Sequence, residues 1–431
     1  MTNIVFITTH DLGRFLNCYG RTTINSPHLD ALARTGVLFQ NSFCTAPQCS
    51  PSRSGLHTGR YPHANGMLGL AHPPFGWELG PGEKHITKRL QEHGYATALV
   101  GEQHLSASGR NLGYDTIVPL GSALQMGNEA AKMLNQLHTG DKPFYLEVGF
   151  HEPHRPYDWG NVTPDDSKGV AVPGFLPDCL ESRQDFAALQ GSVATMDAGV
   201  GVLLEALQQS GLDRSTWLIF TTDHGVAMPR AKGTLYDPGI ETALLMRWPD
   251  QSIEGGGVYG EMISNVDIVP TLLAGANLPF PSEIQGRSFW PLLQNQPYQP
   301  RAEIFAEKTF HQYYEPMRGV RTTSHKLIVN MEASTTIDVP SDARSSPIYP
   351  RLIEAFGGNR AQVELYDLKL DPWEESNLTT QSLSPELSAI EQDLRSRLLG
   401  WMEQTGDPIL RGPISSPYYQ EVVEWLHQSN I

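Results

Sequence analysis

The most informative stretch of this chain for its fold is Cys49-Ser50-Pro51-Ser52-Arg53-Ser54-Gly55-Leu56-His57-Thr58-Gly59-Arg60. Its residues 52–58, with Pro51 directly before them, predict the first turns of a helix, because proline is favoured where a helix begins. Cys49 would then lie at the helix N-terminus, where free backbone N–H groups favour an anion. A lone cysteine is most often a small buried thiol, so the spacing of its neighbours has to carry any further interpretation.

Cys49, Pro51 and Arg53, followed by Thr58-Gly59, resemble the Cys-x-Pro-x-Arg signature of the type I sulfatases. The resemblance implies that a formylglycine-generating enzyme oxidises Cys49 to formylglycine (3-oxoalanine), and that the hydrated aldehyde is the nucleophile. It also implies that Arg53 binds the hydroxyl oxygens of that group. A gem-diol suits this reaction because its sulfate monoester can return to the aldehyde and expel sulfate, whereas a serine sulfate ester would be stable.

Composition limits the classes of protein and partner. The 431 residues allow two or three domains, and 39% hydrophobic residues with 40 Gly and 32 Pro describe a globular protein with many turns. The 31 basic and 47 acidic residues give a formal net charge of −16, which argues against nucleic acid as a partner. An anionic substrate must therefore be held by a local cluster of cations.

Two features of the sequence bear on where the chain acts. No run reaches the roughly 20 apolar residues of a membrane span, so no membrane partner is expected. Residues 2–7 lack the basic segment and cleavage site of a signal peptide, and they predict the first core strand instead. The chain as given is expected to be cytoplasmic, whereas one trimmed of a signal peptide would be periplasmic or secreted and would look the same. A homo-oligomer stays open.

Short apolar strands alternate with helical segments along the first 300 residues. Strands are predicted at residues 4–8, 96–101, 144–149, 217–222 and 243–248, and helices at 27–35 and 183–209. This order predicts an α/β domain with a largely parallel sheet, and ligands of such sheets bind beyond the carboxyl ends of the strands. We therefore expect one edge to gather the residues that follow these strands: His10, Asp11, His104, His151, Asp223 and His224.

The character of the chain changes after about residue 300. Strand-like runs at 303–306, 318–321, 326–330 and 363–368 precede a predicted helix at 384–404, and residues 331–350 are predicted to form a loop. Residues 364–378 resemble the closing segment of sulfatases, which implies a small antiparallel sheet with a final helix. We expect an α/β, alkaline-phosphatase-like sulfatase fold. Its catalytic domain, 1–300, would contain a large mixed but mostly parallel sheet flanked by helices, and residues 301–431 would form a C-terminal subdomain.

The resemblance also implies one divalent metal ion. The segment ending in His10-Asp11 is similar to the opening strand of the family, which usually ends in two aspartates, and Asp223-His224 resembles the other half of the site. With the modified Cys49 these are the expected ligands, and the ion would polarise the sulfate oxygens. Calcium is usual in the family, but imidazole nitrogens shift the preference toward manganese or another transition metal. His10 is either a ligand or turned out of the ligand shell.

Further groups are expected around the sulfate. The segment 101–105 resembles the family's Gly-Lys-x-His, in which His104 matches as a catalytic residue and Glu102 replaces the lysine. Lys232, nine residues after Asp223, is then expected to bind the sulfate, and Glu102 would point away or pair with another cation. The segment 150–154 resembles Phe-His-x-Pro-His, which makes His151 the expected general acid and places His154 on the pocket wall or in a structural role.

Weaker matches at residues 27–34, 65–70, 316–320 and 326–330 resemble the sulfamidase (N-sulfoglucosamine sulfohydrolase) subgroup. By that resemblance His72, His311 and Arg318 line the pocket, with a structural role equally open for each. The expected substrate is a small sulfated sugar such as a glycosaminoglycan fragment bearing N-sulfoglucosamine. Three alternatives stay open: an aryl or alkyl sulfatase, a phosphodiester or phosphonate monoester hydrolase of the same superfamily, and a catalytically weak binder of sulfated sugars.

Overall fold

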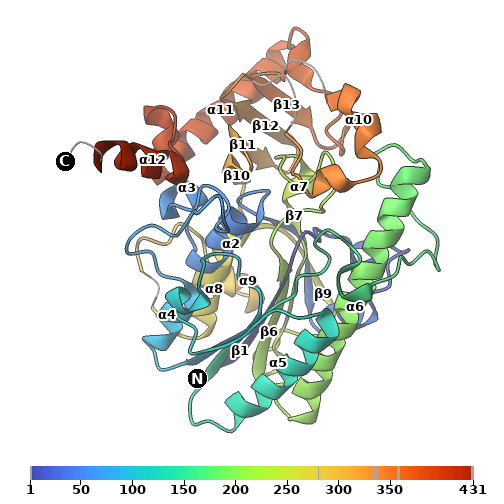
Figure 1. Ribbon diagram of the computed structural model, residues 1–431, viewed down its shortest axis with the longest axis vertical. Coiled ribbons are helices and arrows are strands. Elements are labelled where there is room, and N and C mark those ends of the chain that lie inside the picture. The colour runs from blue at the N-terminus through green and yellow to red at the C-terminus, as the bar shows by residue number, and fades with distance from the viewer. Residues whose placement is uncertain (1, 280, 334–337, 357–359, 429–431) are drawn as a thin grey trace.

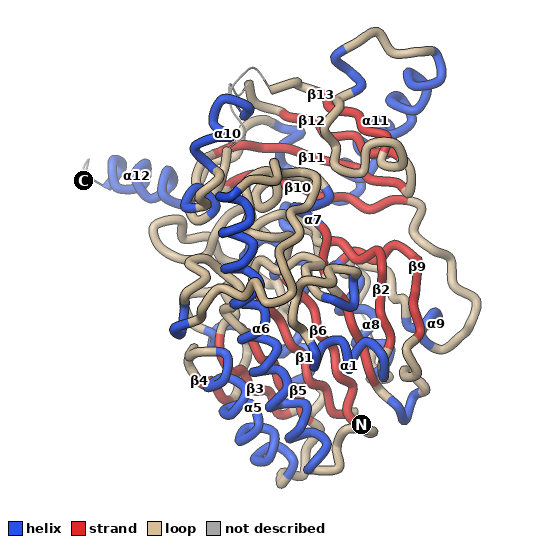
Figure 2. Tube along the Cα trace, turned by 90° about the vertical axis from the view of Figure 1, so that its right-hand side faces the viewer, coloured by secondary structure: helices blue, strands red, loops and turns tan. Residues whose placement is uncertain are grey.

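Two β-sheets form the framework of the protein. The computed structural model describes residues 2–279, 281–333, 338–356 and 360–428. A nine-stranded sheet lies in the N-terminal part of the chain and a four-stranded sheet in the C-terminal part. Figures 1 and 2 show the small sheet at one end of the large one.

The centre of the large sheet is parallel. Its strands run in the order β4-β3-β5-β1-β6, and their bounds are β1 (Asn3–Thr9), β3 (Ala96–Gly101), β4 (Thr116–Val118), β5 (Phe144–Gly149) and β6 (Thr216–Thr222). Thr8 pairs with Gly149 of β5, and Thr9 pairs with Thr222 of β6. Since Gly101 of β3 also pairs with Gly149, the carboxyl ends of four strands lie side by side, and the residues after them meet at one edge.

The other side of the sheet is mixed. Four strands complete it: β2 (Val37–Phe43), β7 (Glu241–Thr242), β8 (Leu244–Arg247) and β9 (Gly257–Ser264). β8 runs antiparallel to β6 and to β2, while β9 runs parallel to β2. The strand predicted at 243–248 therefore exists, but its direction breaks the parallel pattern.

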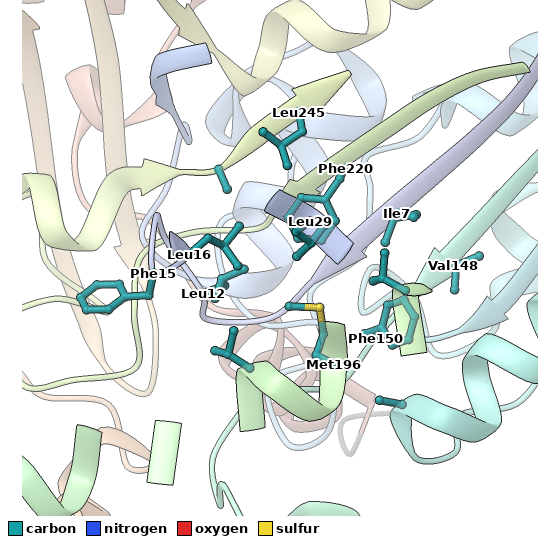
Figure 3. Close-up of a cluster of buried hydrophobic side chains, with 14 of the residues drawn as sticks. Ile7, Leu12, Phe15, Leu16, Leu29, Val148, Phe150, Met196, Phe220 and Leu245 are labelled. Atoms are coloured by element: carbon teal, nitrogen blue, oxygen red, sulfur yellow. The ribbon is translucent and has the colours of Figure 1, made fainter. Parts of the chain in front are cut away.

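Helices cover both faces of the large sheet. One face packs against α1 (Pro27–Thr35), α5 (Ala123–His138) and α6 (Leu180–Gln209), and the other against α2 (Cys49–Thr58), α4 (Ile86–Gln91) and α8 (Ile268–Gly275). Val5 and Ile7 point into the first layer and Ile4 and Phe6 into the second, which explains why β1 is apolar throughout. Figure 3 shows Met196 of α6 among the side chains of the first layer.

By length and composition alone α6 could cross a membrane. However, 67% of its most apolar 18-residue window is buried inside the protein, and α6 packs against α5 and the sheet. Its apolar residues therefore belong to the protein core.

The C-terminal sheet is antiparallel, in the order β10-β11-β12-β13. Its strands are β10 (Glu303–Phe310), β11 (Tyr314–Thr322), β12 (His325–Asn330) and β13 (Val363–Asp367). One face packs on α11 (Pro385–Thr405) through Leu394, Leu398 and Trp401. The other face shares a core with the large sheet, in which Ile304 and Met317 meet Phe43. The remaining short or terminal helices are α3 (Pro62–Asn65), α7 (Asp237–Ile240), α9 (Trp290–Leu293), α10 (Tyr349–Phe356) and α12 (Pro417–Gln428).

Candidate active site

Cys49 is the first residue of α2 and is 2% exposed. Its Sγ lies 3.4 Å from Nε2 of His224. Burial alone would raise the pKa of the Cys49 thiol, but Lys232 and His224, with hydrogen bonds involving His10 and His104, lower this pKa well below its usual value. The position of Cys49 at the N-terminus of a helix also favours a lowered thiol pKa, because the free N–H groups there favour negative charge.

A cavity of about 130 Å³ opens onto Cys49. Its walls include five of the expected site residues: His72, His104, His154, Lys232 and His311. Five further lining residues were not anticipated: Leu70, Phe75, Gln312, Ser341 and Asp342. The cavity is therefore rich in imidazole and carries one lysine.

Four expected metal ligands converge beside the thiol. Ligand atoms of Asp11, Cys49, Asp223 and His224 all lie within 4.8 Å of one another. His224 Nε2 is 3.1 Å from Asp11 Oδ1, and the Asp11 backbone N–H donates to Asp223 Oδ1 at 3.0 Å. Asp11 Oδ1 is buried, and its contact with His224 lacks hydrogen-bond geometry. Two buried carboxylates beside a thiol and an imidazole form a donor set that fits a divalent cation.

The charges of this group depend on one another. Burial would lower the pKa of His224, but Asp223 and Asp11 raise it to about 10. Burial would raise the pKa of Asp223, but His224, His10 and Arg53 lower it. Without a metal ion His224 is thus held as a cation between two carboxylates, so a bound cation would replace its proton.

His10 lies between two sets of possible ligands. Its Nδ1 is 3.2 Å from Asp223 Oδ2, and its Nε2 is 3.3 Å from Glu102 Oε2. It belongs to one group with Asp11, Cys49 and His154, and to a second group with Glu102 and His104. His10 therefore remains within reach of a metal ion instead of turning away from the site.

Glu102, which stands where the family has lysine, does not line the cavity. Its Oε2 lies 2.9 Å from Nδ1 of His151 and 3.3 Å from Nε2 of His10. Burial would raise the pKa of Glu102, but His10, His151 and His104 lower it strongly. The carboxylate thus pairs with imidazoles, as the sequence suggested it would pair with a cation.

Lys232 is held between two carboxylates. Its Nζ lies 2.8 Å from Asp11 Oδ2 and 2.5 Å from Asp342 Oδ2. Asp342 comes from the loop predicted at 331–350, of which residues 334–337 lie outside the described part of the chain. No sequence pattern marked Asp342, because its contact with Lys232 joins segments that lie far apart in the chain. His154 Nε2 is 3.6 Å from the same Asp342 oxygen.

The remaining expected residues have distinct surroundings. Arg53 does not line the cavity but contacts Asp223 Oδ2 at 3.2 Å and the end of β1 at Thr8 and Thr9. His104 Nε2 lies 2.9 Å from His72 Nδ1. Two of the residues, Asp11 (φ 52°) and His104 (φ 53°), adopt left-handed backbone conformations, which are uncommon outside glycine and cluster at functional sites.

Arg318 is the expected pocket residue that the structure places elsewhere. It is fully buried on β11, where its Nε lies 2.6 Å from Asp407 Oδ2 and its Nη2 lies 3.5 Å from Glu307 Oε2. Two carboxylates already neutralise this guanidinium, and it does not line the cavity at Cys49. Of the two roles left open for Arg318, its position fits the structural one, and its placement in the lining of this cavity is corrected.

Sequence comparisons agree with the motif and with the C-terminal segment. A family model described as "Sulfatase" matches residues 2–278, and one described as "N-sulphoglucosamine sulphohydrolase, C-terminal" matches residues 229–347. The chain is 31% identical to N-sulphoglucosamine sulphohydrolase of Homo sapiens over 475 residues, which covers 95% of this chain and 92% of that protein. The similarity therefore spans both sheets.

Solved structures share the fold. BT4656, solved in complex with its substrate D-glucosamine-2-N,6-O-disulfate, has a TM-score of 0.71 at 20% identity, covering 96% of this chain and 99% of that chain. The phosphonate monoester hydrolase of Agrobacterium radiobacter has a TM-score of 0.72 at 19% identity, covering 94% and 96%. Because proteins of both chemistries have this fold, the fold by itself does not choose between them.

Proposed function

This chain belongs to the sulfatase family and is a hydrolase of sulfate esters or sulfamates, and on that premise we propose that its substrate is a small N-sulfated sugar such as glucosamine N-sulfate. Support comes from the similarity to N-sulphoglucosamine sulphohydrolase along both the catalytic and the C-terminal segments. The observation that supports sulfate hydrolysis at this site is the position of Cys49, at a helix N-terminus, in a small cavity and beside Asp11, Asp223 and His224.

The family implies a metal ion and a formylglycine in general, and we assign both to this site. Cys49 is the residue for a formylglycine-generating enzyme to modify, and the hydrated aldehyde supplies one hydroxyl for attack on sulfur and a second that allows sulfate to leave. Asp11, Asp223 and His224 are the residues to hold the metal ion, with His10 as a further ligand. The ion supplies polarisation of the sulfate oxygens.

The other residues bind the sulfate, orient the site residues and transfer protons. Lys232 binds the sulfate, because it is the cation that lines the cavity among the described residues. Arg53 orients Asp223 from behind the metal group, at 3.2 Å. His151 does not line the cavity, but we assign it the proton donated to the leaving nitrogen or oxygen. Glu102 holds its Nδ1 at 2.9 Å, so Nε2 is the atom to carry that proton. His72 and His104, in contact with each other, face the sugar.

The size of the cavity and the charge of the chain favour a terminal residue of a sugar over an internal one. About 130 Å³ is small compared with the roughly 300–1,000 Å³ of drug-sized pockets. A net charge of −16 gives a long sulfated polymer no general attraction. We therefore expect removal of one sulfate from each non-reducing end.

The test is a substrate panel under matched conditions, measured by release of sulfate or phosphate. It contains glucosamine N-sulfate, an oligosaccharide with that group at its non-reducing end, sugar O-sulfates, an aryl sulfate, a phosphodiester and a phosphonate monoester. We expect the highest kcat/KM for the N-sulfates. Preference for O-sulfates would overturn the substrate assignment, and preference for the phosphodiester or phosphonate would overturn sulfate transfer as the main activity.

Binding of sulfated sugars without turnover is a function of another class, and the same panel separates it. We considered this alternative because Glu102 stands where the family has lysine. Its carboxylate is paired with two imidazoles and so does not repel a sulfate in the cavity. Binding of glucosamine N-sulfate without sulfate release, by protein shown to carry formylglycine, would establish the binder instead.

Metal removal gives a separate prediction. Chelation should abolish sulfate release, and manganese should restore it at least as well as calcium, because nitrogen ligands favour transition metals. The measurement is the aryl sulfatase rate of chelated protein after addition of each metal at equal free concentration. Restoration by calcium alone would show that His10 and His224 do not ligate the ion.

A further inference from the structure

A second cluster of buried polar residues lies at the other end of α2. His57 is in the last turn of this helix, His85 is the N-cap residue of α4, and Glu147 is on β5. All three are at most 1% exposed. His57 follows Cys49 by eight residues, which corresponds to roughly 12 Å along a helix. The catalytic cavity has none of the three in its lining.

Three atoms of this cluster converge without a partner. His57 Nε2, His85 Nε2 and Glu147 Oε1 are buried, and none has a hydrogen-bond partner among the described residues. One ligand atom from each residue lies within 4.8 Å of the other two, and His57 Nε2 is 3.3 Å from Glu147 Oε1. Buried polar atoms are nearly always satisfied. Three unsatisfied atoms that face one another therefore indicate that something binds between them.

The other polar atoms of Glu147 and His85 are already bound, and this fixes the direction of the free atoms. Glu147 Oε2 accepts from the hydroxyl groups of Tyr114 at 2.7 Å and Tyr145 at 2.9 Å. His85 Nδ1 is 2.8 Å from Thr87 Oγ1 and 3.3 Å from the Thr87 backbone N–H. Thr87 Oγ1 in turn donates to the backbone carbonyl of Leu112. Metal-binding carboxylates and histidines are usually held by such outer contacts.

Burial shifts the ionisable groups of this cluster toward their neutral forms. Burial and Arg53 lower the pKa of His57 to about 3, and burial together with His57 lowers the pKa of His85. Both imidazoles are therefore neutral at neutral pH, the form that ligates metals. Arg53 is paired with Asp223 instead, at 3.2 Å. Burial raises the pKa of Glu147 above its usual value, although the hydroxyl groups of Tyr114 and Tyr145 and the charge of Arg53 act in the opposite direction, because a buried carboxylate is costly unless it is paired.

We propose that His57, His85 and Glu147 bind one zinc-class divalent transition-metal ion that joins α2 to α4 and β5. Two imidazoles and one carboxylate form a set typical of zinc and related metals, and nitrogen ligands disfavour calcium and magnesium. Two ligands about 2.1 Å from one ion at a tetrahedral angle are about 3.4 Å apart, close to the 3.3 Å between His57 Nε2 and Glu147 Oε1. A water molecule would complete the coordination. The ion stabilises the helix that begins with Cys49 and takes no part in sulfate transfer.

The test is zinc stoichiometry, measured by elemental mass spectrometry after zinc loading and gel filtration. Protein without substitutions should retain two zinc ions per chain, one at the Asp11, Asp223 and His224 group and one between His57, His85 and Glu147. His85→Asn and Glu147→Gln should each lose one ion, and His224→Ala should lose the other. The control is His138→Asn, a change at an exposed residue of α5, which should retain two. This readout is independent of activity and of the substrate proposed above.

If the variants at buried positions do not fold, a measurement on protein without substitutions shows whether an ion binds in this cluster. Crystals of zinc-loaded protein, with data collected at the zinc absorption edge, should show an anomalous peak between His57, His85 and Glu147. A peak restricted to the Asp11 and Asp223 group, or an ordered water in this position, would overturn the proposal. Folded His85→Asn protein that retains as much zinc as the chain without substitutions would also overturn the proposal.

Discussion

Glu102 is the residue at which this chain departs most clearly from the signature of its family. An acidic group next to sulfate would repel it, so the sequence led us to expect that Glu102 points away or pairs with a cation. The structure pairs it with His151 and His10. The pairing links the substitution to the second departure, since His10 itself replaces an aspartate of the family pattern. An exchange of lysine and aspartate for glutamate and histidine thus keeps the local charge close to balance while placing imidazoles around the metal group.

The first prediction concerns the proton given to the leaving group. Replacing His151 with asparagine should lower kcat/KM for glucosamine N-sulfate by about 10² to 10⁴, the usual contribution of a general acid. The rate on a nitrophenyl sulfate should change little, because nitrophenolate leaves without protonation. Steady-state kinetics on both substrates measures this. Glu102→Gln should show the same pattern with a smaller loss, because Glu102 acts by orienting His151.

Equal losses on the two substrates would contradict this role. They would indicate that His151 binds the sulfate itself, which both substrates share.

His311 provides a prediction on pH. Burial, with Lys308 and Lys232, lowers the pKa of His311 to about 3, whereas a histidine in the unfolded chain titrates near 6.5. Between these values the unfolded state binds more protons, so the free energy of unfolding rises with pH, by at most about 1.4 kcal/mol per pH unit for this group. His311→Gln should reduce the slope between pH 4.5 and 6.5 and leave it unchanged above pH 7.

Urea unfolding at a series of pH values measures the slope, with exposed His138→Gln as the control. A His311→Gln slope identical to that of the unmodified protein would show that His311 is accessible to protons in the folded state.

At the scale of elements, α2 positions the chemistry. The sequence predicted a helix that begins after Pro51, but α2 begins at Cys49 with Gln48 as its N-cap. Proline is tolerated throughout the first turn, since its missing N–H would have no helical partner there. The earlier start makes Cys49 the first residue of the helix, at the end where backbone N–H groups favour an anion.

Arg318 joins β11 of the small sheet to the segment after α11, and this gives a prediction on stability. Arg318→Met leaves Asp407 and Glu307 buried without their cation, so the free energy of unfolding should fall by about 3–5 kcal/mol. The matched control is Arg397→Met, because Arg397 forms an exposed ion pair with Glu303 at 2.8 Å and should cost less than about 1 kcal/mol. Denaturant unfolding measures both.

The KM of Arg318→Met for glucosamine N-sulfate should be unchanged. A raised KM with normal stability would return Arg318 to the substrate pocket.

At the scale of the whole molecule, the predicted fold is confirmed: a large, mixed sheet flanked by helices with a small antiparallel sheet after it. The site edge could be predicted because strands β1, β3, β5 and β6 are parallel, so the residues after them must meet. The direction of β8 and the pairing of β2 with β9 could not, because apolar patterns do not encode the partner of a strand. Asp342 and the partners of Arg318 were missed for the same reason, since they depend on contacts between distant segments.

The measurement that tests the account most directly is sulfate release from glucosamine N-sulfate by protein produced together with a formylglycine-generating enzyme. Mass spectrometry of the Cys49 peptide first establishes the extent of modification, and ion chromatography then counts sulfate per modified chain. We predict many turnovers by the modified protein and none by Cys49→Ala under the same metal conditions. Sulfate release by Cys49→Ala at the rate of the formylglycine-carrying protein would contradict the role of Cys49 as nucleophile. No release from any sulfate by fully modified, metal-loaded protein would contradict the assignment of sulfatase activity.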